Sequence, residues 1–588
     1  MNKINESSVD EFLKNIRRKM TLEQKIGQCV VIGMSGTHIT NDIKEAISKY
    51  HCGGIRLSGF MRMFRYFSDS KAKKTEMDSG YRPSLQKITE QGIPEYVSPE
   101  DYALMLNSLR DLAAQRDPAV PLHMVIDQEG DTSRDFARGG VVQFPSNMGL
   151  AASGDPELTY RVSLMLAKEM KASGFNMIHS PVVDVNINPA NPEIGRRAFS
   201  DDPEIVAVHA EAMVRAFKEE KIIAAAKHFP GRGDSATDAH HSCPVLNVDK
   251  ERMHKVELYP YKKLIEAGLD AVMVAHCIYP AYDEKISTVS KTLITGLLRE
   301  ELGFKGLITT DSMTMGALID RYGVGEACAR SLAAGADTVL MKAENHWRGE
   351  TFYTIKQWVE KGLITEESLN EKVDRILEIK YKYGLFENMG KVDHLKASEP
   401  YRDAAVIKTA EEAAEKAAMV IKDNLSAIPL DPDKKILLIN QLYTIKTPND
   451  KYDHPSLFSE LLEEDFPGMQ TYETSFGFES TDKEDSVVSF ALKGNYDLII
   501  CTNFYDRSEK PHTYIKQLIE KNLPVLLITN TPYCIKDYGG LITDAQSIVL
   551  NMNLTPEGLR TTKRILLGKL TGRANWPLKN YDPFNFLQ

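Results

Sequence analysis

Paired cysteines and long apolar runs are both absent from this sequence of 588 residues. Its seven cysteines stand singly, with no CxxC spacing, so the sequence predicts neither a disulfide framework nor a cysteine metal site. No apolar run reaches the ~20 residues needed to cross a bilayer. The stretch MNKINESSVDEFLKNIRRKM also lacks the apolar core of about 7 to 15 residues that marks a signal peptide. We therefore expect a cytoplasmic protein that does not associate with membranes.

An excess of positive charge is also missing. The formal net charge is −10 at pH 7, whereas nucleic acids and anionic membranes bind surfaces that carry positive charge. Hydrophobic residues make up 42% of the chain and charged residues 26%, which is typical of a folded globular protein. Because one core rarely serves a chain of this length, we expect two domains and no nucleic-acid partner.

The first two-thirds of the sequence contains eight short apolar runs, each followed by a stretch with helical periodicity. The predicted strands are residues 29–34, 53–58, 122–127, 176–185, 223–229, 271–277, 307–311 and 338–342. Eight strands that alternate with helices predict an α/β fold of the (β/α)8 TIM-barrel type. This barrel typically has ~250 residues, which leaves room here for insertions.

Ionisable residues fall at the ends of several of these apolar runs. They are Asp127, Asp184, Lys227, His228, His276 and Asp311. Taken singly, such a residue more often caps a helix or sits hydrogen-bonded in the core. Active sites of this barrel lie at the carboxyl ends of the strands, so the six residues together predict one pocket at that end.

A second domain is predicted to follow the barrel. A helical stretch at 351–383 completes the first domain (1–387), a linker spans 388–400, and the remainder (401–588) forms the second domain. That domain begins with a helix at 404–418, and its predicted strands are 434–440, 496–502, 523–530 and 545–551. The pattern indicates a smaller α/β/α sandwich, an open parallel sheet with helices on both faces. It contains no GxGxxG or P-loop motif, so we expect no chemistry of its own.

The segment AAAKHFPGRGDSATDAHHSCP (224–244) is dense in ionisable residues beside glycines. It leaves a buried strand at Lys227 and then carries Asp234, Asp238, His240 and His241 on a loop. Histidines and aspartates at these spacings fit a divalent-metal site. They equally fit metal-free proton transfer, in which Asp238 orients His240 and raises its basicity. The residues alone leave both chemistries open.

Longer motifs of this chain resemble glycoside hydrolase family 3, in its β-N-acetylglucosaminidase branch. They are KHFPGRGDSATDAH (227–240), DQEG (127–130), FPSNMGLAA (144–152), PVVDVNINPANPEIGRRAFSDDP (181–203), MVAHCIYPAYD (273–283) and LLREELGFKGLITTDSMTMGA (297–317). The resemblance covers nearly the whole predicted barrel. It implies a double-displacement reaction with net retention, in which a carboxylate attacks the anomeric carbon and water then releases the sugar.

The same resemblance implies roles for individual residues. Asp311 takes the position of the nucleophile, His240 that of the general acid/base, and Asp238 that of its partner. The implied sugar-binding residues are Asp127, Arg134, Arg197, Lys227 and His228. Charged groups hydrogen-bonded to sugar hydroxyls give strong and directional orientation. The alternative for each binding residue is an ion pair in the core. No cofactor or metal ion is implied, and the expected partner is a small carbohydrate.

Three places depart from the family pattern. In DQEGDTSRDF, Asp131 replaces a glycine and Asp135 stands where a binding arginine is expected, so Arg134 is the candidate substitute. Arg232 stands where this branch often has a histidine. The long segment 60–115 is predicted to lie above the pocket, as an aglycone-binding loop or as an ordinary lid or dimer contact.

These features predict a retaining exo-β-N-acetylglucosaminidase that acts on small cell-wall or chitin fragments. The first alternative is a β-glucosidase or another exo-glycosidase of the same family. A second is a phosphorylase, because a neutral histidine acid/base repels incoming phosphate less than a carboxylate does. A metal-dependent hydrolase and a sugar-binding protein with an inactive site are the remaining alternatives.

Overall fold

The computed structural model describes residues 6–35, 38–58, 98–131, 141–239, 242–341, 345–441, 457–474, 481–505, 513–535 and 539–586. Eight parallel strands form the larger sheet, in the order β10-β1-β2-β3-β4-β5-β6-β9. Their bounds are β1 Val30–Ser35, β2 Gly54–Ser58, β3 His123–Ile126, β4 Met177–Ile178, β5 Ile223–Phe229, β6 Ala271–Val274, β9 Leu307–Thr310 and β10 Val339–Met341. All eight predicted strands are confirmed.

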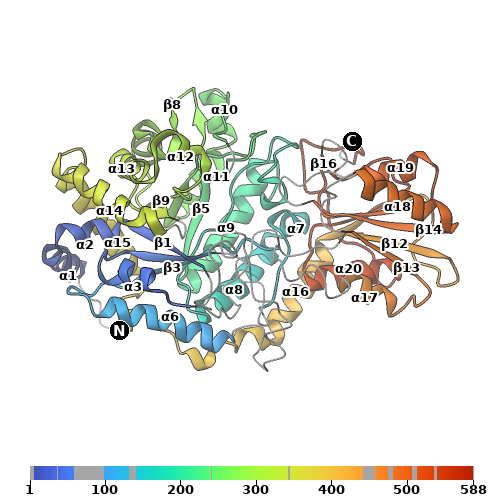
Figure 1. Cartoon of the computed structure of the whole chain (residues 1–588), viewed down its shortest axis with the longest axis horizontal. Coiled ribbons are helices and arrows are strands. Elements are labelled where there is room, and N and C mark those ends of the chain that lie inside the picture. The colour runs from blue at the N-terminus through green and yellow to red at the C-terminus, as the bar shows by residue number, and fades with distance from the viewer. Residues whose placement is uncertain are drawn as a thin grey trace.

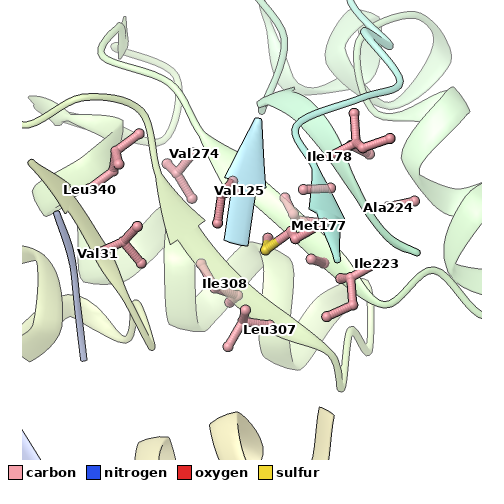
Figure 2. Close-up of a cluster of buried hydrophobic side chains, with 14 of the residues drawn as sticks. Val31, Val125, Met177, Ile178, Ile223, Ala224, Val274, Leu307, Ile308 and Leu340 are labelled. Atoms are coloured by element: carbon pink, nitrogen blue, oxygen red, sulfur yellow. The ribbon is translucent and has the colours of Figure 1, made fainter. Parts of the chain in front are cut away.

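The sheet closes into a barrel between its first and last strands. Ser312, just after β9, forms a parallel bridge with Leu340 of β10, and the Asp337 N–H donates to the Ile308 carbonyl at 2.8 Å. Inside, apolar side chains from different strands form one buried cluster, which includes Val31, Val125 and Met177 (Figure 2). Each such side chain stabilises the fold by about 1.5–3 kcal/mol. The predicted (β/α)8 barrel is therefore confirmed.

The fourth strand is shorter than its apolar run predicts. Residues 176–185 were expected to form one strand, but β4 ends at Ile178. Pro181 lies three residues further and has no N–H to donate to a neighbouring strand. Pairing resumes only as a single bridge between Val182 and Lys227. Asp184 therefore stands on a loop at the mouth of the barrel rather than inside a strand.

Helices surround the barrel, as Figure 1 shows. They are α1 Glu6–Lys19, α2 Leu22–Gln28, α3 Asn41–Ser48, α6 Pro99–Ala114, α7 Asn147–Ala152, α8 Pro156–Ala172, α9 Pro203–Glu219, α10 Lys250–Lys255, α11 Tyr259–Glu266, α12 Gly316–Tyr322, α13 Val324–Ala334, α14 Asn345–Glu360 and α15 Glu366–Lys382, with the π-helix η3 at Thr292–Glu301. Asp-Pro pairs begin two of them. Asp155 caps α8 and Asp202 caps α9, each accepting two backbone N–H groups ahead of a proline at the first helical position.

The helical stretch predicted at 351–383 consists of two helices, α14 and α15. They are separated at Gly362, whose φ of +68° ends a helix without steric cost. One loop prediction needs correction. Within the segment predicted as a loop (60–115), residues 99–114 form α6, with Tyr102 and Leu106 buried against the barrel. Ser98 caps the start of this helix, and Pro99 is its first residue. The rest of that segment, up to residue 97, lies outside the described residues.

The second sheet has six strands in the order β11-β18-β15-β14-β12-β13. Their bounds are β11 Ala418–Asp423, β12 Ile436–Gln441, β13 Gln470–Thr474, β14 Leu498–Asn503, β15 Val525–Thr529 and β18 Ser547–Asn551. Helices α18 (Thr481–Gly494) and α19 (Tyr514–Glu520) pack on one face, and α17 (Leu457–Glu463) and α20 (Pro556–Leu566) on the other. The four predicted strands and the helix-covered open sheet are confirmed.

The two edge strands of this sheet were not predicted, and one of them runs the other way. Most residues of β11 and β13 are only partly buried. β13 (QTYET) has no apolar run, and the apolar residues of β11 (AMVIKD) follow directly on the predicted helix at 404–418. β11 pairs antiparallel with β18, which makes the sheet mixed rather than purely parallel. Apolar composition predicts that a strand exists, whereas its direction depends on the connections around it.

The remaining elements are short. Two hairpins, β7 Ile278–Tyr279 with β8 Asp283–Ile286 and β16 Cys534–Ile535 with β17 Gly539–Gly540, lie outside the main sheets. The short 3-10 helices are η1 Gly195–Arg197, η2 Ser287–Val289, η4 Glu387–Gly390, η5 His394–Lys396 and η6 Pro400–Arg402. The last three cover most of the predicted linker and lead into α16 (Ala404–Lys416). The domain boundaries at 387 and 401 remain predictions.

The barrel and the second sheet pack against each other beside α7, between the two lobes seen in Figure 1. Met148 and Ala152 of α7 share one buried apolar cluster with Leu550 and Met552 from the end of β18. The Ser146 hydroxyl, which caps α7, also donates to the Met552 carbonyl at 2.8 Å. In the described part of the chain, no helix is both long and apolar enough to cross a membrane.

Candidate active site

Asp127 lies directly after β3, at the carboxyl end of the barrel, among three basic side chains. Arg56, the middle residue of β2, pairs with its Oδ2 atom, and His179 Nδ1 and Lys227 Nζ lie 3.1 and 3.3 Å from its Oδ1 atom. Burial alone raises the pKa of Asp127, but Arg56, Lys227 and His179 outweigh burial and hold this pKa well below its usual range. Asp127 is therefore ionised at neutral pH, and its side chain is still 19% exposed.

Glu129 connects two of the predicted sugar-binding residues. Arg197 binds it through two parallel hydrogen bonds, from Nε at 2.8 Å and from Nη2 at 2.9 Å. Lys227 Nζ lies 2.5 Å from Glu129 Oε1, the oxygen that also accepts the Arg197 Nη2 hydrogen bond. The side chains of Arg197 and Lys227 are each only 4% exposed. Arg197 and Lys227 therefore form the core ion pairs that were the alternative to a sugar-binding role. These ion pairs also hold Lys227 next to Asp127.

His228 pairs with Asp184 on the neighbouring loop. Its Nδ1 atom lies 2.6 Å from Asp184 Oδ2, while Asp184 Oδ1 accepts the Arg232 backbone N–H at 2.7 Å. Burial lowers the pKa of His228 well below its usual range and raises that of Asp184 to about 6. At neutral pH His228 is therefore neutral and donates its Nδ1–H to the Asp184 carboxylate, which leaves Nε2 as an acceptor.

Asp311 is the first residue after β9, and its side chain is 18% exposed. The Ser312 N–H donates to Asp311 Oδ1 at 2.7 Å, and Arg232 Nη2 lies 3.6 Å from Oδ2. His276, at the end of the adjacent strand, hydrogen-bonds the Ser312 carbonyl at 2.9 Å. Helix α12 begins only at Gly316, with Met315 at its cap position. Asp311 therefore does not cap that helix, which was the structural alternative for this residue.

The loop after β5 follows a path that only glycine permits at two positions. Gly231 has a φ of +126°, and a Cβ atom on Gly233 would lie 1.8 Å from the Val185 carbonyl oxygen. Such close approaches leave the backbone no room to shift. Asp238 is partly exposed further along this loop, and the next residue, Ala239, donates its N–H to Glu193 Oε2 at 3.4 Å. His240, His241 and Arg134 lie outside the described residues.

Several residues of this site were not identified as functional from the sequence. Besides Glu129 and Arg232, they are Arg56, His179 and Glu193. A recognisable signal existed for Arg56 and His179, because each is a single basic residue within or next to an apolar strand-like run. Glu193 shows no such signal, because it lies in an irregular segment and reaches Arg232 only through the fold.

Comparisons with known proteins support the resemblance inferred from the motifs. Residues 21–379 match the model of the glycosyl hydrolase family 3 N-terminal domain. β-Hexosaminidase A of Pseudoalteromonas piscicida is 31% identical over 301 residues, which are 47% of this chain and 50% of that protein. The β-N-acetylglucosaminidase/β-glucosidase of Cellulomonas fimi is 31% identical over 338 residues, with 54% of this chain and 58% of that protein covered. The chain thus matches between half and three-fifths of the length of these two relatives.

A shorter relative and a solved structure match more completely. A β-hexosaminidase of Stenotrophomonas maltophilia (strain K279a) is 36% identical over 239 residues, which are 39% of this chain and 70% of that protein. The structure of a family 3 β-N-acetylglucosaminidase from Paenibacillus sp. str. FPU-7 superposes with a TM-score of 0.78 at 26% identity, covering 95% of this chain and 99% of that one. From its barrel, its motifs and these matches, the chain belongs to glycosyl hydrolase family 3.

Proposed function

We propose that this protein is a retaining exo-β-N-acetylglucosaminidase that removes terminal β-linked N-acetylglucosamine from small glycosides, such as cell-wall or chitin fragments. The observation that carries the proposal is the placement of two partly exposed carboxylates at one end of the barrel. Asp127 lies among Arg56, His179 and Lys227, and Asp311 lies beside Arg232. Family membership and the names of the relatives support the same conclusion.

Asp127 is suited to holding a sugar ring. An ionised carboxylate accepts hydrogen bonds from two neighbouring hydroxyls, and the fixed cations around it keep its oxygens in one position. Lys227, tied to both Asp127 and Glu129, supplies N–H donors on the same side. Because this arrangement exists before the sugar arrives, little ordering is left for the binding step.

Asp311 is suited to nucleophilic attack. In the proposed reaction its carboxylate attacks the anomeric carbon while His240, oriented by Asp238, protonates the departing glycosidic oxygen. The glycosyl–Asp311 ester is then attacked by water, whose proton passes to His240, and the Asp311 carboxylate is released with the anomeric configuration retained. The Ser312 N–H and the Arg232 guanidinium stabilise the carboxylate before attack and after release.

A panel of p-nitrophenyl glycosides tests the sugar preference. We expect turnover of the N-acetylglucosaminide to exceed that of the glucoside; the reverse order would favour the β-glucosidase alternative. Product analysis with and without inorganic phosphate separates a hydrolase, which releases free sugar, from a phosphorylase, which releases sugar 1-phosphate. An inactive sugar-binding protein would turn over none of these substrates.

Covalent trapping tests the nucleophile. A 5-fluoro-N-acetylglucosaminyl fluoride should label the peptide that contains Asp311, as read by mass spectrometry. Asp311→Asn should abolish the label and lower kcat by roughly a thousandfold or more. The matched control is Asp320→Asn, which changes an exposed aspartate of the following helix and should keep both the label and the rate. A label on another residue would refute the assignment of Asp311.

A further inference from the structure

Arg232 is a buried cation next to the proposed nucleophile, at a position where related loops often carry histidine. Its side chain is 2% exposed. The backbone around it is fixed on both sides, because its N–H donates to Asp184 and its carbonyl accepts the Asn191 side-chain amide at 2.9 Å. Gly233 then passes against the Val185 carbonyl with no room for a side chain. The guanidinium therefore extends from a rigid turn.

The guanidinium lies between two carboxylates. Arg232 Nη2 is 2.8 Å from Glu193 Oε1 and 3.6 Å from Asp311 Oδ2. The Glu193 side chain is 2% exposed, whereas that of Asp311 is 18% exposed. One cation thus balances a buried carboxylate on one side and the carboxylate that faces the pocket on the other.

Glu193 continues this contact toward the loop that carries the proposed acid/base. Its Oε2 atom accepts the Ala239 N–H at 3.4 Å, and Ala239 stands between Asp238 and His240 in the sequence. The end of β9 is thus joined to the second half of this loop by a series of contacts, which runs from Asp311 to Arg232, Glu193 and Ala239. Asp311 is therefore connected to the residue next to Asp238 through two ion pairs that share Arg232 and one backbone hydrogen bond.

We propose that Arg232 is a positioning residue that keeps the Asp311 carboxylate ionised and in place, and that the Arg232–Glu193 pair holds the acid/base loop in register with it. This inference rests on the proposed function, because it takes Asp311 as the nucleophile. Without the guanidinium, Asp311 would lose its ion-pair contact with Arg232, and Glu193 would keep only the more distant Arg197, 4.0 Å from its Oε1 atom. Two neighbouring carboxylates in a low-dielectric site disfavour ionisation of both.

Other charged and titratable groups surround this pair and are part of its balance. Asp184 and Arg197 lie close to Arg232, and His276 lies close to both Asp311 and Arg232. Burial lowers the pKa of His276, so this imidazole is neutral at neutral pH. Arg197 is bound to Glu129, and its Nη1 atom also lies 4.0 Å from Glu193 Oε1, whereas Asp184 is bound to His228. Among these described neighbours, Arg232 is the cation in direct ion-pair contact with Asp311.

The test compares the pH dependence of kcat/KM for the full-length enzyme and three variants. Arg232→Gln removes the cation, and we expect the acid limb, which reports the nucleophile's ionisation, to move up by about one pH unit or more. Glu193→Gln removes the carboxylate that competes most closely with Asp311 for Arg232, so the acid limb should stay or move down. Arg232→Lys keeps the charge and should keep the limb near its wild-type position.

A purely structural ion pair would give a different result. In that case Arg232→Gln and Glu193→Gln would lower thermal stability and kcat together, with neither moving the acid limb, and the proposal would be overturned. If Arg232→Gln fails to fold, the Glu193→Gln and Arg232→Lys profiles decide: an upward shift of the limb in either contradicts the proposal. Trapping with the fluorinated sugar separates failure of this inference from failure of the proposed function. If wild-type Asp311 carries no label, the proposed function itself is refuted.

Discussion

Asp131 and Leu554 join the barrel to the second domain by a direct hydrogen bond, in which the Leu554 backbone N–H donates to Asp131 Oδ2 at 2.7 Å. Nη1 of Arg196 lies 2.7 Å from the same oxygen, and the side chains of Asp131 and Arg196 are 0% and 3% exposed. Asp131 follows Glu129 by two residues, so this contact lies beside the carboxylate that binds Lys227 and Arg197. Asp131, which stands where the family pattern has glycine, thus forms a contact between the two domains.

Asp131→Asn should destabilise the fold. The amide still accepts from Leu554, but it no longer balances the buried Arg196 cation, and breaking a buried ion pair from one side costs about 3–5 kcal/mol. Thermal melting should show a clearly lower Tm. The double variant Asp131→Asn/Arg196→Met should regain part of the loss, because the uncompensated charge is gone. A single variant that melts with the wild type would contradict this account.

Gly233→Ala should impair activity more than its size suggests. The added methyl would meet the Val185 carbonyl oxygen at 1.8 Å, so the turn that carries Arg232 must move. A displacement of about 1 Å near reacting groups lowers rates by about a hundredfold, and we expect kcat/KM to fall by at least tenfold. The matched control is Gly296→Ala in η3, where no atom lies within 4 Å of the new Cβ. Equal activity of the two variants would refute the role given to this close approach.

The sequence predicted the parts of this fold that depend on local pattern. Apolar runs identified all eight barrel strands, and the barrel's geometry then placed Asp127 and Asp311 at one end. Partners were harder to predict, since Arg56 and His179 reach Asp127 from two different strands and no spacing along the chain encodes that meeting. Edge strand β11 was missed because its short apolar run, AMVI, follows directly on the helix predicted at 404–418.

Glu257 should make stability depend on pH. Burial raises the pKa of Glu257 from 4.5 to about 6, against the lowering effect of Arg252. Between these values the folded protein binds more protons here than the unfolded chain, so stability falls as pH rises through this window, by about 2 kcal/mol in all. Glu257→Gln cannot ionise and should lose this dependence. Its Tm relative to wild type should therefore improve between pH 4.5 and 6.5.

The matched control for that measurement is Glu251→Gln in the neighbouring helix α10. The Glu251 side chain is 78% exposed, so water surrounds it in the folded protein as in the unfolded chain. Its Tm should run parallel to that of the wild type at every pH. If the Glu257→Gln curve also runs parallel, burial does not control the ionisation of Glu257.

Asp238→Asn and Asp234→Asn together distinguish proton transfer from metal catalysis in the loop after β5. Asp234 is bound at 3.2 Å by Arg252, which also binds Glu257, so its loss should change kcat little. Asp238→Asn removes the charge that raises the basicity of His240, and we expect kcat to fall by about a hundredfold or more. The loss should be smaller for p-nitrophenyl glycosides than for disaccharides, because a good leaving group needs less protonation. Activity should survive chelation by EDTA, whereas a metal site would lose activity in both variants and on chelation, with recovery when zinc is added back.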